Sequence, residues 1–284
     1  MKHLVLLLAL CAACSPVGAG AEPAPTAIAD YATQLTAPAP DYRKLIARPP
    51  IMPKGEMRRE GVGPLPTDAK AIGETWLERL KAKNALGGYG LAGKGTDGPV
   101  NMIDTLLTAR EFGAWVKENG WTAPRYLDWG FQPELIRPAV SERAAPAVRL
   151  WTQSETRTGI QLEALLGGRV VMKDGCLWYQ RDGEPDRIAW LHAETGLDRD
   201  AEGYLIFVNR VTGETMARLG EEMTWAGPNQ VTAPEWKIKD IQQVCGQAEL
   251  FSVGNPESGE RMMTQHPHLR RATNTPPPQP KPRQ

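Results

Sequence analysis

Residues that could carry out chemistry are sparse in this 284-residue chain, and the first of them form a glycine-rich run. Residues 88–93 read Gly-Tyr-Gly-Leu-Ala-Gly, the spacing of a dinucleotide-binding loop, and Lys94 adds the outline of a phosphate-binding loop. The run follows a helical pattern instead of a strand, and Gly95 stands where a serine or threonine would reach Mg²⁺. We therefore interpret it as a flexible glycine loop and expect no cofactor.

Two further patterns resemble metal sites only in part. Residues 198–203, Asp-Arg-Asp-Ala-Glu-Gly, begin like a calcium loop, but Asn209 stands where a bidentate glutamate is needed, so an acidic hairpin turn is the simpler interpretation. His266 and His268 have no third ligand nearby, whereas a catalytic zinc site takes three. A Ser-His-Asp triad would have to use His192, and no G-x-S-x-G elbow accompanies it. The sequence predicts no metal and no catalytic residue.

Tryptophan is the other residue type that could bind a ligand, because its ring stacks on sugars as well as filling cores. The chain has nine tryptophans, and we expect most of them in the core. Trp121, Trp129 and Trp151 lie in a loop-rich region that also contains Arg125. We predict these four residues as a candidate binding surface for an envelope glycan or protein.

The first 21 residues form an export segment. Residues 4–13 are an apolar run of signal-peptide length, too short to span a bilayer. Residues 19–21, Ala-Gly-Ala, fit cleavage by ordinary signal peptidase before Glu22. Residues 11–15, Cys-Ala-Ala-Cys-Ser, resemble the lipobox of bacterial lipoproteins, although Cys11 stands where that family usually has an aliphatic residue. The resemblance implies lipidation of Cys14, hence a membrane-anchored lipoprotein at the outer membrane or periplasmic face; the alternative is a soluble periplasmic protein.

The charge balance and the number of cysteines bear on the class of ligand and on a disulfide. The 33 basic residues equal the 33 acidic ones, so no charge excess indicates binding to nucleic acid. Once the export segment is lipidated or removed, two thiols remain, Cys176 and Cys245. In an oxidising compartment we expect them to form a disulfide, and the alternative is two separate free thiols. No other apolar run approaches the length of a membrane span.

Helical patterns dominate residues 63–160. Thr67 or Asp68 can cap a first helix, which the glycines at 87–88 would end. Residues 108–111, Thr-Ala-Arg-Glu, form a capping-box pattern in front of a second short helix. We therefore expect this region to be mainly helical or irregular.

From residue 161 to 250 the apolar residues alternate, which predicts a β-rich module. Turn signals at 173–175, 181–183 and 212–213 separate its short apolar runs, and residues 236–245 are expected as the last strand. The module should be a small antiparallel sheet or barrel.

The two ends of the chain are rich in proline, which fixes φ and removes an amide donor. We expect residues 22–62 to be a disordered tether and residues 251–284 a disordered basic tail. The predicted fold class is therefore α+β, with short helices in the N-terminal half, the small sheet or barrel in the C-terminal half, and disordered ends.

Part of the predicted module also resembles a known type of domain. The segments 175–177 (Gly-Cys-Leu), 187–190 (Arg-Ile-Ala-Trp) and 217–222 (Ala-Arg-Leu-Gly-Glu-Glu) are similar to a small β-rich module of bacterial secreted proteins. The resemblance covers about residues 165–245 and implies a fold but no activity. We expect an exported cell-envelope protein with a non-enzymatic binding or structural role. The alternative is a hydrolase of an envelope polymer that uses two carboxylates brought together by folding.

Overall fold

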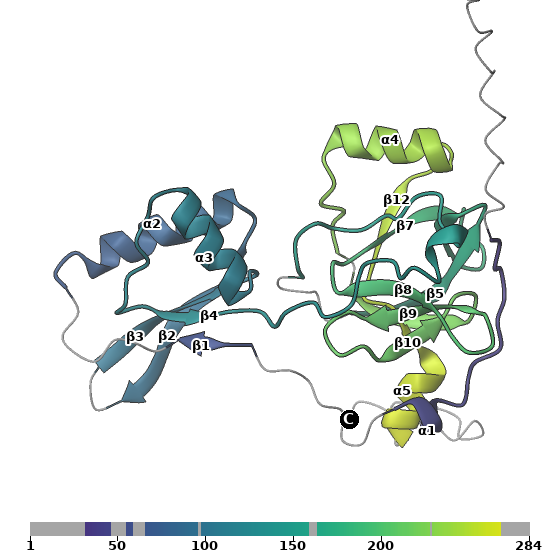
Figure 1. Ribbon diagram of the computed structural model, residues 1–284, viewed down its shortest axis with the longest axis horizontal. Coiled ribbons are helices and arrows are strands. Elements are labelled where there is room, and N and C mark those ends of the chain that lie inside the picture. Colours follow the sequence, from purple (N-terminus) through teal and green to yellow (C-terminus); the bar gives the residue numbers. More distant parts are fainter. Residues whose placement is uncertain are drawn as a thin grey trace, which may run out of the picture.

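The computed structural model describes residues 32–46, 55–58, 66–95, 98–158, 164–227 and 229–267. They form an α+β fold, as the sequence predicts, with two lobes joined by the extended chain that follows strand β4 (Figure 1). The small lobe contains the described residues 55–58, 66–95 and 98–132, and the β lobe residues 32–46 and the described residues from 133 onward. Within the described residues, no helix is both long enough and apolar enough to cross a bilayer.

The described part of the small lobe is a four-stranded sheet with two helices on one face (Figure 1). The strand order is β1-β4-β3-β2, in which β3 and β4 run parallel and the other neighbours antiparallel. The elements are β1 (Met57–Arg58), α2 (Ala69–Ala82), β2 (Leu86–Gly95), β3 (Gly98–Thr105), α3 (Ala109–Glu118) and β4 (Asp128–Gly130). Trp76, Phe112 and Trp129 are buried at the centre of its core.

Both helices of the small lobe begin where the sequence predicts. Asp68 is the N-cap of α2. Thr108 starts α3 with the predicted capping box: its hydroxyl accepts from the Glu111 amide at 3.1 Å, and its own amide donates to the Glu111 carboxylate at 2.8 Å. The predicted end of α2 is wrong, because the chain turns at Asn84, with a φ of 53°, and the glycines at 87–88 lie in β2. Asparagine adopts this left-handed conformation more readily than most residues, so it ends the helix first.

The sheet of the small lobe corrects the prediction of a mainly helical or irregular region. Residues 88–93, predicted as a flexible loop, lie in β2, where Tyr89 pairs with Ile103 of β3. Glycine is depleted in strands, so the composition of this hairpin hides it. Strands β1 and β4 are only two and three residues long and leave no periodic pattern. Hydrogen bonding to neighbouring strands therefore outweighs the low strand propensity of these short or glycine-rich segments.

The described β lobe contains two sheets. The larger has the strand order β12-β7-β6-β5-β11-β13 and the smaller β10-β9-β8. The strands are β5 (Ala164–Lys173), β6 (Cys176–Gln180), β7 (Arg187–Leu191), β8 (Thr195–Arg199), β9 (Leu205–Asn209), β10 (Thr215–Arg218), β11 (Glu222–Gly227), β12 (Leu250–Gly254) and β13 (Glu257–Ser258). A short 3₁₀ helix, η1 (Ala145–Ala147), precedes them. Both sheets share one apolar core, in which Leu177, Leu197 and Phe207 are fully buried.

The predicted hairpin turns of the β lobe are confirmed. Asp174 and Gly175 join β5 to β6 with φ values of 48° and 76°, and Gly183 and Gly213 each adopt 79° at two later turns. Strand β12 runs parallel to β7, so the larger sheet is mixed rather than purely antiparallel. A parallel pair needs a crossover connection, and here the connection includes a helix. The lobe matches the sheet alternative of the prediction, not the barrel.

Residues 236–245, predicted as the last strand of the module, belong instead to helix α4 (Glu235–Cys245). Pro234 is its N-cap, and its carbonyl accepts from the Ile238 amide at 3.1 Å. Ile241 is buried against β7 and is one helical turn from Ile238 and Cys245. Apolar residues spaced three and four positions apart indicate a helix. The predicted strand instead assumed that apolar and polar residues alternate.

The predicted disulfide between Cys176 and Cys245 is confirmed. The Cα atoms lie 5.8 Å apart, although the two residues are 69 positions apart in the sequence. The bond joins the first residue of β6 to the last residue of α4. Helix α4 is therefore attached to the larger sheet covalently at its end and through Ile241 at its middle.

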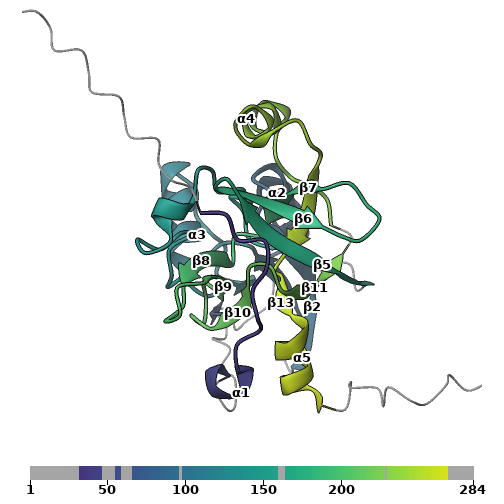
Figure 2. The same ribbon diagram turned by 90° about the vertical axis from the view of Figure 1, so that its right-hand side faces the viewer.

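Parts of both proline-rich ends, predicted to be disordered, are folded onto the β lobe. Residues 32–46, called the strap from here on, cross the lobe to α1 (Tyr42–Leu45), which contacts α5 (Gly259–Gln265) (Figure 2). Gln34 exchanges two backbone hydrogen bonds with Met172 of β5, at 2.8 and 3.0 Å. The prediction is therefore wrong for the strap, for residues 55–58, which contain β1 of the small lobe, and for residues 251–267. Cys14 lies outside the described residues.

Candidate ligand-binding site

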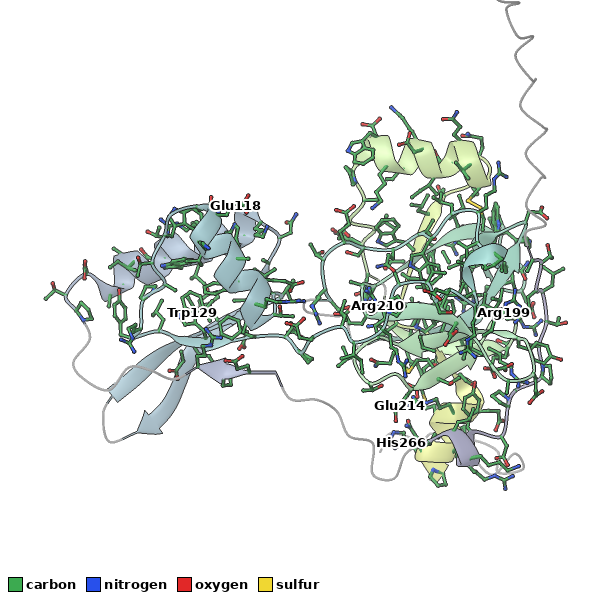
Figure 3. All side chains as sticks on the ribbon, in the orientation of Figure 1. Glu118, Trp129, Arg199, Arg210, Glu214 and His266 are labelled. Atoms are coloured by element: carbon green, nitrogen blue, oxygen red, sulfur yellow. A yellow bond between two sulfur atoms is a disulfide. The ribbon has the colours of Figure 1, made fainter. Side chains whose placement is uncertain are left out.

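The structure does not bring the four residues of the predicted binding surface together. Trp129 is 4 % exposed inside the small lobe (Figure 3), where its Nε1 donates to a backbone carbonyl at 3.1 Å. Trp121 is half-buried beneath the guanidinium of Arg79, 4.0 Å from its ring centroid. Trp151 packs on the core of the β lobe, whereas Arg125 is exposed on the small lobe. The predicted surface is wrong, because these tryptophans pack in two separate cores.

The histidine that a catalytic triad would need is held in a network of its own. The Thr158 hydroxyl lies 2.7 Å from Nδ1 of His192 and 2.8 Å from Oε2 of Glu194. An ionised carboxylate can only accept, so the hydroxyl donates to Glu194 and accepts from the Nδ1–H of His192. Burial lowers the pKa of His192. A hydroxyl whose proton is committed to a carboxylate is not poised to be deprotonated by the imidazole.

The acidic turn at residues 198–203 closes on itself and on an arginine. The carboxylate of Asp200 accepts from the backbone amides of Glu202 and Tyr204, both at 2.9 Å, and from Nε of Arg218 at 2.6 Å. The hairpin-turn interpretation is therefore confirmed. Within the part of the chain that the structure describes, no three histidine, cysteine, aspartate or glutamate side chains gather as a metal site.

A cavity of about 660 Å³ beside β5 and β11 contains carboxylates of the kind that a hydrolase uses. Its acidic lining residues are Asp182, Asp186 and Glu222. Lys173 donates to Asp186 and holds the pKa of that carboxyl below its usual range. Arg169 pairs with Glu222 at 2.6 Å. Because a general acid in glycoside hydrolysis needs a raised pKa, Asp186 does not fit that role.

Glu221 is a buried acid that holds the strap. Its carboxylate accepts from the hydroxyls of Tyr42 and Ser258 and, at 2.5 Å, from the backbone amide of Arg218. Burial raises the pKa of Glu221 above its usual range, and these hydrogen bonds oppose the shift. The three donors come from α1, from the end of β13 and from β10, so this carboxylate joins the strap to the C-terminal part of the lobe.

Glu221→Gln should alter how the stability of the β lobe depends on pH. A folded-state pKa above the ordinary value of 4.5 means that the folded protein binds this proton more tightly than the unfolded chain does. The stability that proton binding by Glu221 contributes is complete below pH 4.5 and is lost as the pH rises through the folded-state pKa. We expect the free energy of unfolding of the natural protein to fall relative to that of the variant from pH 4.5 towards neutrality. Urea unfolding of both proteins measures this, and parallel pH curves would contradict it.

A larger cavity, of about 920 Å³, opens where the small lobe faces the β lobe. Its volume lies within the range of ligand-binding pockets. Side chains of both lobes line it, among them Lys81 of the small lobe and Ser154, Arg157, Trp190, Trp236 and Lys237 of the β lobe. We call it the interlobe cavity.

Trp236 offers this cavity an open aromatic face. It is 64 % exposed and lies in the first turn of α4. The adjacent Lys237 places its Nζ 2.7 Å from Oε1 of Glu155 and 5.4 Å from the ring centroid of the buried Trp190. The amphipathic indole of Trp236 is therefore available for stacking against a ligand.

Among the described residues, no carboxylate pairs with the Arg157 guanidinium, which lines the cavity. Arg157 is only 7 % exposed, and its buried Nη1 forms no hydrogen bond. Its neighbour Arg210, on the side of the β lobe that faces the small lobe (Figure 3), is also cationic. Burial, and then the charge of Arg157, lower the pKa of Arg210. Burying an unpaired cation is costly for folding, so the arrangement suits an anion that arrives from outside.

Sequence reasoning missed both principal residues of the interlobe cavity. Trp236 was hidden by the prediction of a strand, although the helical spacing after Pro234 would have placed it in the first turn of a helix. Arg157 lies in an irregular segment, and its burial depends on residues distant in the sequence. The local sequence contains no sign of that burial.

No protein-family model, curated protein or solved structure matches this chain. The function must therefore be inferred from the site's own geometry. The features available are the exposed ring of Trp236 and the buried guanidinium of Arg157, in one cavity between the lobes.

Proposed function

We propose that this chain is an exported cell-envelope protein that binds an envelope glycan in the interlobe cavity and does not transform it. The observation that carries the proposal is the presence in one cavity of the exposed Trp236 and the uncompensated Arg157. Aromatic faces stack on sugar rings, and a small number of fixed polar groups then orient the ligand. Of the two hydroxyls that flank Arg157 in the sequence, that of Thr158 donates to Glu194, and that of Thr156 lies 3.1 Å from the Ser154 hydroxyl.

The same proposal includes export and anchoring. The lipobox-like residues 11–15 support lipidation of Cys14, and the alternative is a soluble form that starts at Glu22. The disulfide supports an oxidising compartment, because such bonds persist there. Mass spectrometry of the mature N-terminus distinguishes the two forms: a diacylglyceryl-modified Cys14 supports the anchor, and a peptide beginning at Glu22 supports the soluble form.

Trp236→Ala should weaken glycan binding at least about tenfold, because the truncation removes the stacking face of the cavity. The probe is the insoluble glycan of purified bacterial cell-wall sacculi. Co-sedimentation of the folded protein over a series of sacculus concentrations gives the apparent Kd of each variant.

Tyr89→Ala is the matched control. Tyr89 is an aromatic residue of similar exposure, 68 %, but it lies on β2 outside the cavity lining. We expect its removal to leave co-sedimentation unchanged. If both variants lose binding equally, the attraction is not specific to the cavity, and if Trp236→Ala binds like the natural protein, the proposed function is wrong.

A further inference from the structure

The charges of the interlobe cavity indicate the chemical class of its ligand, an inference that rests on the proposed function. We infer that the ligand is a glycan whose sugars bear carboxylates, with the carboxylate held by Arg157 while the sugar ring stacks on Trp236. Both residues line the same cavity, one buried in its β-lobe wall and the other exposed at the first turn of α4.

The other cations of the cavity are already neutralised. Lys237 pairs with Glu155 at 2.7 Å, and Lys81 pairs with Glu78 at 2.7 Å. Arg157 has no such carboxylate among the described residues, and its buried Nη1 has no hydrogen-bond partner. Of the described cations that line the cavity, Arg157 is therefore the one that remains to meet a ligand. One uncompensated guanidinium matches a singly charged carboxylate better than a doubly charged phosphate.

A guanidinium is also the group best shaped for a carboxylate. Its planar fork of N–H donors can bind both carboxylate oxygens, and such charge-assisted pairs are stronger when water is excluded. Arg210, whose charge interacts with that of Arg157, adds positive potential, while its Nη1 donates to the Ala193 carbonyl at 2.6 Å and its Nε to the Arg137 carbonyl at 2.9 Å.

The segment that carries Arg157 is held in place before any ligand arrives. Thr158 donates its amide to Oε1 and its hydroxyl to Oε2 of Glu194, at 2.9 and 2.8 Å. On the other side, the Ser154 hydroxyl accepts from the Thr156 amide at 3.2 Å and lies 3.1 Å from the Thr156 hydroxyl. A backbone fixed on both sides of the arginine lowers the ordering cost of binding.

The test compares one glycan in two charge states. Glycan strands are prepared from sacculi, freed of their peptides so that their sugars bear free carboxylates, and half of the sample is coupled to methylamine, which turns those carboxylates into neutral amides. Isothermal titration of the natural protein should show at least about tenfold tighter binding to the charged strands. A uronic-acid oligosaccharide, titrated in parallel, tells whether the preferred carboxylate lies on the sugar ring itself.

Arg157→Gln should weaken binding to the charged strands at least about tenfold, and it should weaken binding to the amidated strands much less, because a neutral amide forms no ion pair with the guanidinium. Arg157→Lys should recover only part of the loss, because an ammonium lacks the fork. Lys239→Gln is the matched control: it removes one positive charge from the same helix, α4, but Lys239 is exposed and does not line the cavity.

Thermal unfolding of the free protein separates binding from folding. Because an unpaired buried cation destabilises the fold, Arg157→Gln should unfold at the same temperature as the natural protein or at a higher one. A clear fall in the unfolding temperature together with lost binding would assign Arg157 a structural role and overturn the inference.

The titrations also separate the two levels of the proposal. Equal affinity of the natural protein for charged and amidated strands would overturn the carboxylate inference and leave glycan binding standing. Unchanged affinity of Arg157→Gln for the charged strands would do the same. If the natural protein binds neither preparation nor intact sacculi, the proposed function fails as well.

Discussion

Replacing Cys176 and Cys245 together by alanine should lower the free energy of unfolding of the β lobe by about 4 kcal/mol. The bond closes a long loop, with 69 residues of separation, and so removes many conformations from the unfolded chain. Guanidinium unfolding of the natural protein and of the double variant, followed by tryptophan fluorescence, measures the difference.

A reducing agent provides the control for the cysteine prediction. It should destabilise the natural protein by a similar amount and leave the double variant unaffected. Reduction should also weaken glycan binding, because the bond holds the helix that carries Trp236 and Lys237. The prediction is contradicted if the natural protein unfolds at the same denaturant concentration with and without reductant.

Trp129→Ala should destabilise the small lobe by about 3–5 kcal/mol, the usual cost of truncating a buried aromatic side chain. The ring of Trp129 lies 4.8 Å from that of Phe112 and 5.4 Å from that of Trp76, measured between centroids. Its removal leaves a cavity beside these two aromatic rings and deletes the hydrogen bond of its Nε1. Urea unfolding, followed by near-ultraviolet circular dichroism, should show an earlier transition.

Trp236→Ala is the control for this prediction, because it truncates an exposed tryptophan of the same protein. Because that ring is 64 % exposed, its truncation should change stability by no more than about 0.5 kcal/mol. Trp129→Ala should therefore lower stability, whereas Trp236→Ala should lower glycan binding and leave stability nearly unchanged. A Trp129→Ala protein as stable as Trp236→Ala would mean that the core of the small lobe is not packed around Trp129.

The features predicted correctly from the sequence are those that short segments or simple counts determine. Thr108 and Glu111 lie three residues apart and form their capping box whatever surrounds them. The turn at Asp174 and Gly175 depends on the same two residues that adopt positive φ. The disulfide prediction required only that two cysteines lie outside the predicted export segment.

Most of the features predicted wrongly depend on pairing or packing between segments that the residue pattern of one segment does not reveal. Strand β2 is rich in glycine and has no strand pattern of its own, and it exists because β3 pairs with it. The strap looks like a linker by its prolines, yet Gln34 pairs with Met172, far along the sequence. Trp129 and Trp236 are the same residue type, and only the folded chain makes one a core residue and the other an exposed one.

The position of the strap has a consequence for how the molecule would bear a mechanical load. The chain first contributes residues 32–46 to the β lobe, then builds the small lobe, and returns to complete the β lobe. The small lobe is therefore an insertion whose two ends both lead back into the same host. Tension applied to the N-terminus, for instance through the proposed anchor, would first load two sets of hydrogen bonds. These are the backbone hydrogen bonds between Gln34 and Met172 and the one that the Tyr42 hydroxyl donates to Glu221. The inserted lobe would stay outside the path of the force for as long as those contacts hold.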